Sequence, residues 1–332
     1  MLSYRAILKE SWRMSWKNKF LWFFGFFAAF ISFNVELKIF SRSLNQESGL
    51  NFLSGIKTFV NTGIFSKNSW QNILDLLKTD TSTILLLLLI ILLILGLVAF
   101  FAWLATVSQI GMINSINKIS KNSREKLNIK NGIKTGNKKF WPIFAMNIII
   151  SLVINIIYLL TSLLLVSVVF KSQAVLALVF GLVYIVAVPL SLVFSFVLKY
   201  AIAYSIIENK KFFNSIKQGF RLFKNNWLIS IEMSIILFLI NILAIILLSF
   251  VSFVLFYLLF SLAFALVLMT SSLFLFWTVM IIGALILIAL TVLSGALLNT
   301  FQISSWTNLF ISLRDKKEAS KIERIFQDTE LK

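Results

Sequence analysis

Residues 228 to 313 contain a single charged side chain, Glu232. As one α-helix this run would extend about 130 Å, which is several times the thickness of the hydrocarbon core of a bilayer. The run must therefore fold back on itself, and Met269-Thr270-Ser271-Ser272 is its most polar interruption. We predict two very long helices that meet at this turn, with three or four shorter spans as the alternatives.

Four more apolar segments are candidates for membrane spans, because about 20 apolar residues suffice to cross a bilayer. They are Phe20–Phe33, which is short, Ser82–Ile113, which is the strongest, Trp141–Phe170 and Gln173–Ile207. Only 13% of the residues are charged, whereas a soluble domain carries about 25%. We therefore predict an all-α integral membrane protein with about six transmembrane helices as three hairpins, each preceded by a cytoplasmic-side amphipathic interfacial helix.

The predicted organisation is simple. Residues 1–313 form a single polytopic membrane domain, and residues 314–332 form a charged cytoplasmic tail that is either a solvated helix or disordered. Residues 35–82 are the one long polar loop, in which apolar residues at helical spacing favour short surface helices. Pro189 is expected to kink the fourth span, because proline removes a backbone donor from the helix.

Three basic segments, each directly before an apolar run, resemble one another. Lys9–Arg13, Lys130–Lys134 and Lys217–Arg221 share the order basic, polar, small, apolar, basic, and each is followed by a polar and basic cluster that closes on an aromatic residue. The pattern predicts a threefold internal repeat with units 1–113, 114–207 and 208–313. Convergence is the alternative, because membrane boundaries on the basic side favour Lys, Arg and Trp in general.

The basic residues gather on one side of the predicted topology. With six spans and both termini in the cytoplasm, 24 of the 31 Lys and Arg residues lie on the inner side and six on the outer side. Such a bias follows the positive-inside rule and predicts a multi-pass protein of the cell membrane. It also accounts for the net charge of +18 without nucleic acid, which this charge would suggest in a soluble protein.

The three basic segments suit contact with anionic lipid headgroups on the inner leaflet. Their basic residues would approach the phosphates, and their tryptophans are typical of the headgroup level. The predicted contacts are Arg5, Lys9, Trp12, Arg13, Lys130, Lys134, Lys138, Lys139, Trp141, Lys217, Arg221, Lys224 and Trp227.

Histidine and cysteine are both absent. Their absence removes His-based triads, thiol nucleophiles, imidazole or thiolate metal sites and haem ligation. Gly132 and Gly136 do not form a phosphate loop, because no Lys-Ser or Lys-Thr pair follows them. We predict no catalytic residues, no metal, no cofactor and no enzymatic activity.

Glu232 is the only carboxylate within a predicted span, and an acid in a membrane is a candidate for function. Asn155, Asn241 and Lys199 complete a possible intramembrane polar site. The alternative is structural: Glu232 lies near the inner interface, where it would pair with a base such as Lys199 or Arg221.

Other polar and small residues within the spans have the same two interpretations. Asn147, Asn299 and Gln302 would bond between helices or line a polar path, and interhelical bonding is the favoured interpretation. Gly283 and Gly295 are expected at points of close packing rather than at hinges.

The segment Ala201–Glu208, followed by SIKQGFRLFKNNW, resembles the membrane domain found ahead of some bacterial glycerophosphoryl diester phosphodiesterases. The opening LKESWRMSWKNKFLWFFGFF and the segment SQIGMINSI are similar to stand-alone bacterial membrane proteins of the same superfamily. The resemblance covers most of the transmembrane region and implies the fold. It implies no catalysis here, because the phosphodiesterase activity belongs to a separate soluble barrel and the chain has no histidine for that site.

The resulting functional expectation is a non-catalytic membrane scaffold or accessory module that engages anionic lipid or partner proteins, with no nucleic acid. The alternative is a permease for a small or amphiphilic substrate, which Glu232 and the in-span amides would serve. Assistance in the insertion or assembly of other membrane proteins fits the same features.

Overall fold

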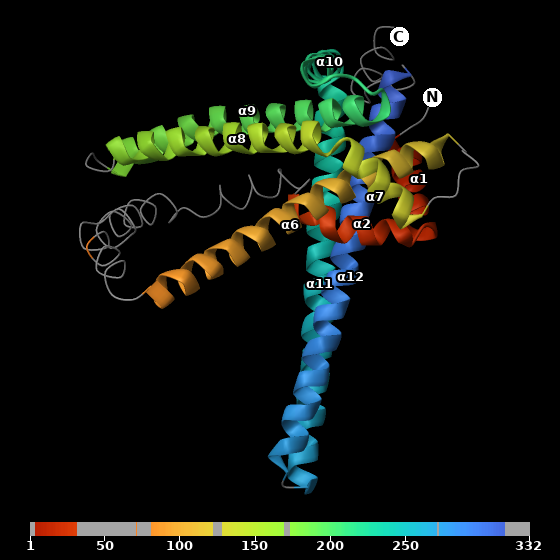
Figure 1. Cartoon of the computed structure of the whole chain (residues 1–332). Helices are drawn as coiled ribbons and strands as arrows, with labels where there is room; N and C mark the ends of the chain where they lie inside the picture. The colour runs from red at the N-terminus through yellow and green to blue at the C-terminus, as the bar shows by residue number, and fades with distance from the viewer. Residues whose placement is uncertain are drawn as a thin grey trace. The chain divides into compact units, whose positions relative to one another are not determined.

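The computed structural model describes residues 4–31, 71, 81–121, 128–168, 173–270 and 272–315. Every regular element within these ranges is a helix, which confirms the all-α fold class (Figure 1). The chain divides into two compact units, described separately below. Unit 1 contains residues 1–33, 104–143 and 199–332, and unit 2 contains residues 34–103 and 144–198.

Five helical segments within the described ranges are long and apolar enough to cross a membrane, so the protein is a multi-pass membrane protein. They are Leu85–Ser120, Phe140–Ile157, Ile185–Ile207, Trp227–Thr270 and Leu273–Arg314. The predicted segment Phe20–Phe33 is not among them. Its described residues form α2 (Phe20–Ala28) and one 3-10 turn, η1 (Ala29–Ile31), and residues 32 and 33 lie outside the described part of the chain. The predicted loop 35–82 lies outside the described residues except at position 71 and at residues 81 and 82, which begin α6 (Thr81–Ser120). The predicted tail 314–332 is described only at residues 314 and 315.

The long charge-poor run forms two helices, as predicted. α11 (Trp227–Thr270) has 44 residues and α12 (Leu273–Arg314) has 42. The two helices meet at the predicted turn and lie side by side (Figure 1). Gly283 of α12 lies against α11, and a Cβ atom at this glycine would be 2.8 Å from the Cδ1 atom of Leu259, which confirms its prediction as a point of close packing.

The core of unit 1 lies around the second half of α12. From Asn299 to Phe310 every side chain of this helix is buried, whichever face it is on. Among the elements that pack directly on α12 are α11, α2 and the amphipathic α1 (Tyr4–Lys17). A helix that is buried on every face must be surrounded by other helices, and this segment is therefore the centre of the bundle.

Further elements belong to unit 1, including the last part of α9 (Gln173–Ile207) from Lys199 onward. α7 (Ile129–Lys138) packs on α2, and α10 (Phe212–Asn225) packs on α11. The second half of α6 (Thr81–Ser120) also belongs to this unit, and its side chains from Thr106 to Ile113 are all buried.

Unit 2 contains the first part of α6 and most of α8 (Phe140–Val168) and α9 (Gln173–Ile207). The bounds of α8 and α9 agree with the predicted spans to within two residues. On α6 the side chains from Leu85 to Phe101 are all exposed, as expected of a surface that is covered by lipid. Pro189 lies inside α9, which continues through it as one helix.

Candidate functional site

Each of the three basic segments forms a helix that ends in a short break, after which an apolar helix begins at once. α1 is followed by α2 at Phe20, α7 by α8 at Phe140, and α10 by α11 at Trp227. Two of the breaks have the same local geometry. The side-chain amides of Asn18 and Asn226 each donate to the carbonyl four residues earlier, at 2.9 and 3.0 Å. These bonds satisfy carbonyl groups at the helix ends, which otherwise lack partners.

α1 has the two faces that the sequence predicts. Arg5, Lys9 and Arg13 are exposed, and the opposite face is buried. The structure decides what covers that face, because α1 packs on α12. The amide of Asn308 on α12 donates to the hydroxyl of Ser11 at 2.9 Å. α1 is therefore part of the protein core, and only its basic and tryptophan side remains at the surface.

Trp12 and Trp16 form the aromatic part of that surface. Both rings are exposed and they stack with centroids 5.9 Å apart. Trp16 also contacts Trp22 of α2, whose ring nitrogen donates to the carbonyl of Ser15 at 2.7 Å. The ring of Phe301 on α12 contacts the ring of Trp12 edge-on, with centroids 5.8 Å apart. An exposed tryptophan cluster held in this way is suited to the headgroup level of a membrane.

α7 separates its charges from its packing face. Lys130, Lys134 and Lys138 are exposed and lie four residues apart, so they form one stripe along the helix. Gly132 and Gly136 are buried. A Cβ atom at Gly132 would lie 2.4 Å from the ring of Phe24, and one at Gly136 would lie 2.6 Å from a methyl group of Val107 on α6. The two glycines thus allow α7 to approach α2 and α6 closely.

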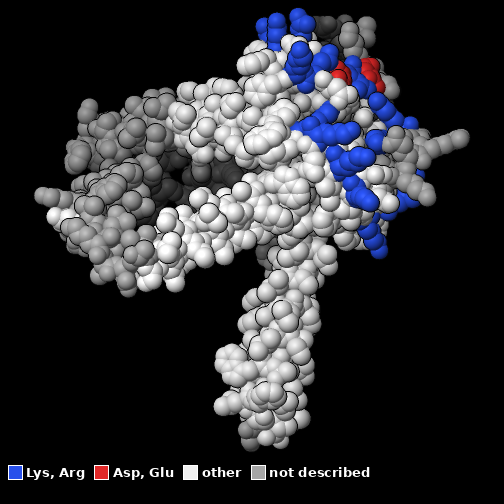
Figure 2. Space-filling view, in the orientation of Figure 1, with Lys and Arg blue, Asp and Glu red and all other residues white. Residues whose placement is uncertain are grey.

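α10 carries its own version of this surface. Lys217, Arg221 and Lys224 are exposed, while Gly219 and Phe223 are buried toward the protein. Two aromatic side chains on α10 remain exposed: Phe213, which is 82% exposed, and Phe220. On the face shown in Figure 2 the Lys and Arg side chains gather over unit 1, and the far part of the α11–α12 hairpin carries none.

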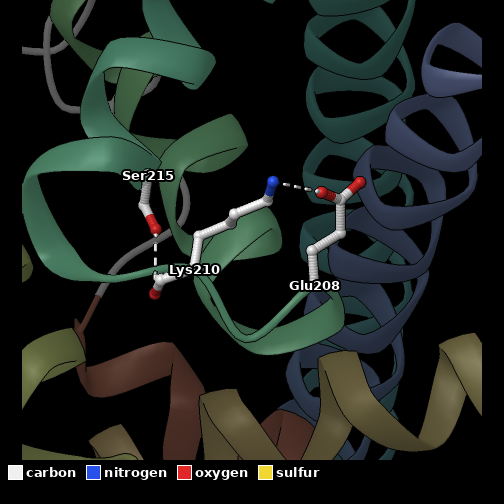
Figure 3. A network of polar contacts seen from close by, with 3 residues as sticks. All are labelled: Glu208, Lys210 and Ser215. Atoms are coloured by element: carbon white, nitrogen blue, oxygen red, sulfur yellow. Dashed lines mark hydrogen bonds and ion pairs between the residues drawn. The ribbon is translucent and has the colours of Figure 1, made fainter.

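The turn between α9 and α10 positions the start of α10. Asn209 has a positive φ of 56°, a conformation that asparagine tolerates better than most residues. On either side of it, the ammonium group of Lys210 lies 3.6 Å from a carboxylate oxygen of Glu208, and the hydroxyl of Ser215 donates to the carbonyl of Lys210 at 3.3 Å (Figure 3).

Lys139 has an internal role that the sequence did not predict. Its ammonium group donates to the carbonyls of Ser205 and Ile206 at 2.8 and 2.9 Å, and to the side chain of Asn209. These carbonyls belong to the last turn of α9, where the helix dipole favours a cation. Burial lowers the pKa of Lys139 below its usual value. The lysine links the start of α8 to the end of α9. Its N–H donors bond within the protein, whereas the sequence predicted that they would contact lipid headgroups.

Four contacts within unit 1 join α1, α11, α9 and α12 in a closed cycle, which we name the polar ring. The hydroxyl of Tyr4 on α1 donates to the carboxylate of Glu232 on α11. Ser230 of α11 and Tyr200 of α9 have hydroxyl oxygens 2.7 Å apart. Ser230 donates its single proton to the carbonyl of Asn226, so Tyr200 is the donor to Ser230.

The other two contacts of the polar ring involve α12. The ammonium group of Lys199 on α9 lies 4.2 Å from the ring centroid of Trp306, and the neighbouring Tyr200 contacts the same ring edge-on. Lys199 is only 5% exposed, and a cation this deeply buried gains from an aromatic face. The bond from Asn308 to Ser11 closes the cycle back to α1.

The predicted intramembrane residues do not all lie in one unit. Glu232, Lys199 and Asn241 belong to unit 1. Glu232 and Lys199 are in the polar ring, and Asn241 is buried nine residues after Glu232 on α11. Asn155 belongs to unit 2, where its side chain is exposed and its amide lies 3.5 Å from the hydroxyl of Ser151.

The sequence did not predict the close approach of α2 and α12 at Gly25. A Cβ atom at Gly25 of α2 would lie 2.1 Å from the hydroxyl of Thr300 and 2.5 Å from the carbonyl of Ala296. The amide of the adjacent Asn299 donates to the carbonyl of Gly25 at 2.6 Å, so the interhelical role favoured for Asn299 is confirmed. Gly295 was predicted as a close-packing point, and this is wrong, because a Cβ atom there meets no described atom within 4 Å.

No protein-family model matches the chain, and no curated protein and no solved structure gives a significant match to it.

Proposed function

We propose that the protein is a non-catalytic integral membrane protein whose basic helices α1, α7 and α10 engage anionic lipid headgroups. The observation that carries the proposal is the shared construction of these helices. Each buries a face that contains small residues against the protein and exposes at least three basic residues, and each runs directly into an apolar helix.

The magnitude of this attraction is considerable when the residues act together. A basic residue close to an anionic membrane surface contributes about 1 kcal/mol. The exposed basic residues on the three helices are Arg5, Lys9, Arg13, Lys17, Lys130, Lys134, Lys138, Lys217, Arg221 and Lys224. Within the part of the chain that the structure describes, these side chains form no hydrogen bonds like those of Lys139, so they can contact lipid without a change in the fold.

The membrane topology that accompanies the proposal has six spans in three hairpins, in the cell membrane, with both termini in the cytoplasm. The excess of Lys and Arg on the inner side supports this orientation. The common order of basic helix, break and apolar helix supports a threefold repeat. It also supports the resemblance to the membrane domain of the glycerophosphoryl diester phosphodiesterase superfamily, for which no catalytic barrel is implied here.

Charge reversal on α7 tests the proposal directly. Lys130→Glu, Lys134→Glu and Lys138→Glu in one variant remove the stripe without touching the buried Gly132 and Gly136. The protein is purified and its lipid occupancy measured by native mass spectrometry in mixed phosphatidylcholine and phosphatidylglycerol. We expect the wild-type preference for phosphatidylglycerol to fall in the variant, and to remain in a Lys→Arg control at the same three positions. An unchanged preference in the variant contradicts the proposal.

A permease is the second candidate, and the interior of α12 favours it. Ser304 and Asn308 lie one turn apart, and the hydroxyl oxygen of the first and the amide oxygen of the second have no hydrogen-bond partner among the described residues. Buried polar atoms of this kind attract water, and Glu232 lies in the same unit. A proton-coupled flux into proteoliposomes that Glu232→Gln abolishes would establish this candidate. Without such a flux, a module that assists partner membrane proteins is the remaining alternative to lipid engagement.

A further inference from the structure

The surface of the α11–α12 hairpin changes character part of the way along it. We name residues 227–241 and 296–314 the proximal segments, and residues 242–270 and 273–295 the distal segments. In the proximal segment of α12 nearly every side chain is buried, whereas in the distal segments only Ala263 and Gly283 are. Large apolar side chains such as Phe253 and Leu285 are more than 60% exposed there.

The lengths of these segments limit what can cover the hairpin. At 1.5 Å per residue α11 and α12 extend about 66 and 63 Å, twice the hydrocarbon thickness of about 30 Å. The distal segments alone extend about 43 and 34 Å, which suits one crossing of a bilayer. A single bilayer therefore covers either the distal or the proximal segments, but not both.

The side chains decide between these two positions. No charged residue occurs from 233 to 313, and the exposed apolar surface of the distal segments has no protein covering within the described residues. Four hydroxyl groups in the distal segments donate to the backbone of their own helix, at 2.7 to 2.9 Å: those of Ser261, Thr270, Thr278 and Thr291. Polar groups that face hydrocarbon need such internal partners. In the proximal segment Ser305 and Thr307 bond in the same way. The contrast lies in the amides of Asn299 and Asn308, which bond to other helices, because the distal segments contain no Asn or Gln.

α6 repeats the same division along its own length. Its side chains from Leu85 to Phe101 are exposed and apolar, and those from Thr106 to Ile113 are buried and include Thr106, Ser108 and Gln109. At the far end of the hairpin, Trp277 is exposed four residues after the start of α12, where a tryptophan suits the opposite interface.

We infer that the hydrocarbon core of the bilayer surrounds the distal segments of α11 and α12, and that the proximal bundle stands in the headgroup region on the basic side and beyond it. The partner of the exposed distal surface is thus the acyl chains of the lipid. The boundary lies near Asn241 on α11 and Ala296 on α12.

This boundary assigns different depths to the three basic helices. α2 crosses α12 at the boundary, because Gly25 contacts Ala296. α1 and α7 lie against this region through Trp16 and Gly132, which contact α2. α10 instead precedes Trp227, which is about 21 Å along α11 from Asn241. We therefore expect charge reversal on α7 to reduce anionic-lipid occupancy more than the equivalent reversal on α10. The depth assignment does not rest on the proposed function, since it follows from the exposure and length of the helices.

Spin labels at single cysteines test the assignment, and the chain has no native cysteine to interfere. The positions are Ile235, Leu239, Leu243, Phe253 and Leu285, which are all exposed apolar residues, with fractions from 53% to 69%. The full chain is reconstituted in phosphatidylcholine and phosphatidylglycerol vesicles. Power saturation then gives the accessibility of each label to oxygen, which enters hydrocarbon, and to a water-soluble nickel chelate.

We expect the oxygen-to-nickel ratio to be severalfold higher at Phe253 and Leu285 than at Ile235, with the change between Leu239 and Leu243. Equal ratios at Ile235 and Leu285 would overturn the inference, because hydrocarbon would then cover both segments. Low accessibility to both reagents at Phe253 and Leu285 would also overturn it, since a second copy or a partner helix would then replace the lipid. A normal depth profile in the α7 charge-reversal variant, together with unchanged lipid preference, would leave the depth assignment intact and reject only lipid engagement.

Discussion

The proximal and distal segments of α11 and α12 belong to the same two helices, yet they are built on different principles. The proximal segment of α12 places Asn299 and Asn308 among neighbouring helices and bonds the amide of each to another element. The distal segments expose Leu and Phe side chains and direct their hydroxyl groups to their own backbone. By length and composition each helix is one continuous apolar segment, so the sequence does not separate its two halves. The apolar side chains of one helix are thus covered by protein in the proximal segment and, as we infer, by lipid in the distal segment.

The largest expected effect comes from a charge placed on each half. Leu285→Lys puts an ammonium group on the exposed distal surface, and Ile235→Lys puts one on the equally exposed proximal surface. If the distal segment alone lies in hydrocarbon, the first change should raise the free energy of membrane insertion by about 2.5–3.5 kcal/mol, and the second should change it little. A glycosylation-based insertion assay measures both, and equal costs would remove the distinction between the halves.

Packing at the helix crossing should show the next largest contrast. Gly25→Ala places a methyl group 2.1 Å from the Thr300 hydroxyl and 2.5 Å from a backbone carbonyl. We expect a loss of about 1–3 kcal/mol in the free energy of unfolding, as is typical of overpacked sites. Gly295→Ala is the matched control, because it adds the same methyl group where no described atom lies within 4 Å. Unfolding of both variants in detergent gives the comparison. Similar stability of the two variants would show that the α2–α12 crossing is looser than described.

The polar ring should respond to the loss of one hydroxyl group. Tyr4→Phe removes the hydrogen bond to Glu232 and keeps the aromatic side chain at position 4. We expect a loss of about 1 kcal/mol in the free energy of unfolding, with faster hydrogen exchange in α1 because that bond helps to attach it. Arg5→Gln is the control, since Arg5 is exposed on the opposite face. Exchange in α1 that is the same in both variants would exclude Glu232 as an anchor for this helix.

A smaller coupling is expected between α1 and α12. Ser11→Ala and Asn308→Ala each break the 2.9 Å bond between the two side chains. Interhelical hydrogen bonds in membrane proteins average about 0.6 kcal/mol in double-mutant cycles. The loss of stability in the double variant should therefore be smaller than the sum of the two single losses by about that amount. A coupling energy of zero would indicate that the two residues act independently.

The smallest expected effect is on the pH dependence of stability, and it involves Lys139 of unit 1. Burial lowers the pKa of Lys139 in the folded protein from 10.5, so at alkaline pH the unfolded chain binds more protons at this site than the folded chain. Stability should therefore rise with pH through Lys139 as the pH approaches 10.5. The measurement is the midpoint of denaturation against pH, and Lys139→Gln should lack this contribution.

Much of the local structure followed from the sequence. The turn after Thr270 was predicted because its residues are the most polar in the run. The bounds of α8 and α9 follow from interruption of apolar runs by polar residues. The buried face of α1, with Tyr4, Ile7 and Ser11, appears in the helical spacing of those residues. These features depend on residues that are close together in the sequence, and such residues determine both the periodicity and the length of a segment.

The candidate site was predicted less completely. Glu232 and Lys199 were recognised because charge is rare in an apolar helix, but Tyr4, Tyr200 and Trp306 were not recognised as their neighbours. Lys139 was assigned to lipid because it is basic and lies at a boundary, whereas its donors meet the end of α9. Gly295 was assigned to packing and Gly25 was overlooked, since a glycine in a sequence does not reveal what lies opposite it.

The sequence by itself determined that the chain is helical, that it crosses a membrane several times, and that three basic amphipathic helices come directly before apolar ones. Segment length, apolar content and charge suffice for these conclusions, because a bilayer imposes its thickness on every span. Only the tertiary structure decided what covers each apolar face. An amphipathic pattern is the same whether lipid or protein lies against it, and the bond from Asn308 to Ser11 joins residues 297 positions apart. Contacts at that separation depend on how the helices pack, and packing is what distinguishes the bundle from the part of the hairpin that faces lipid.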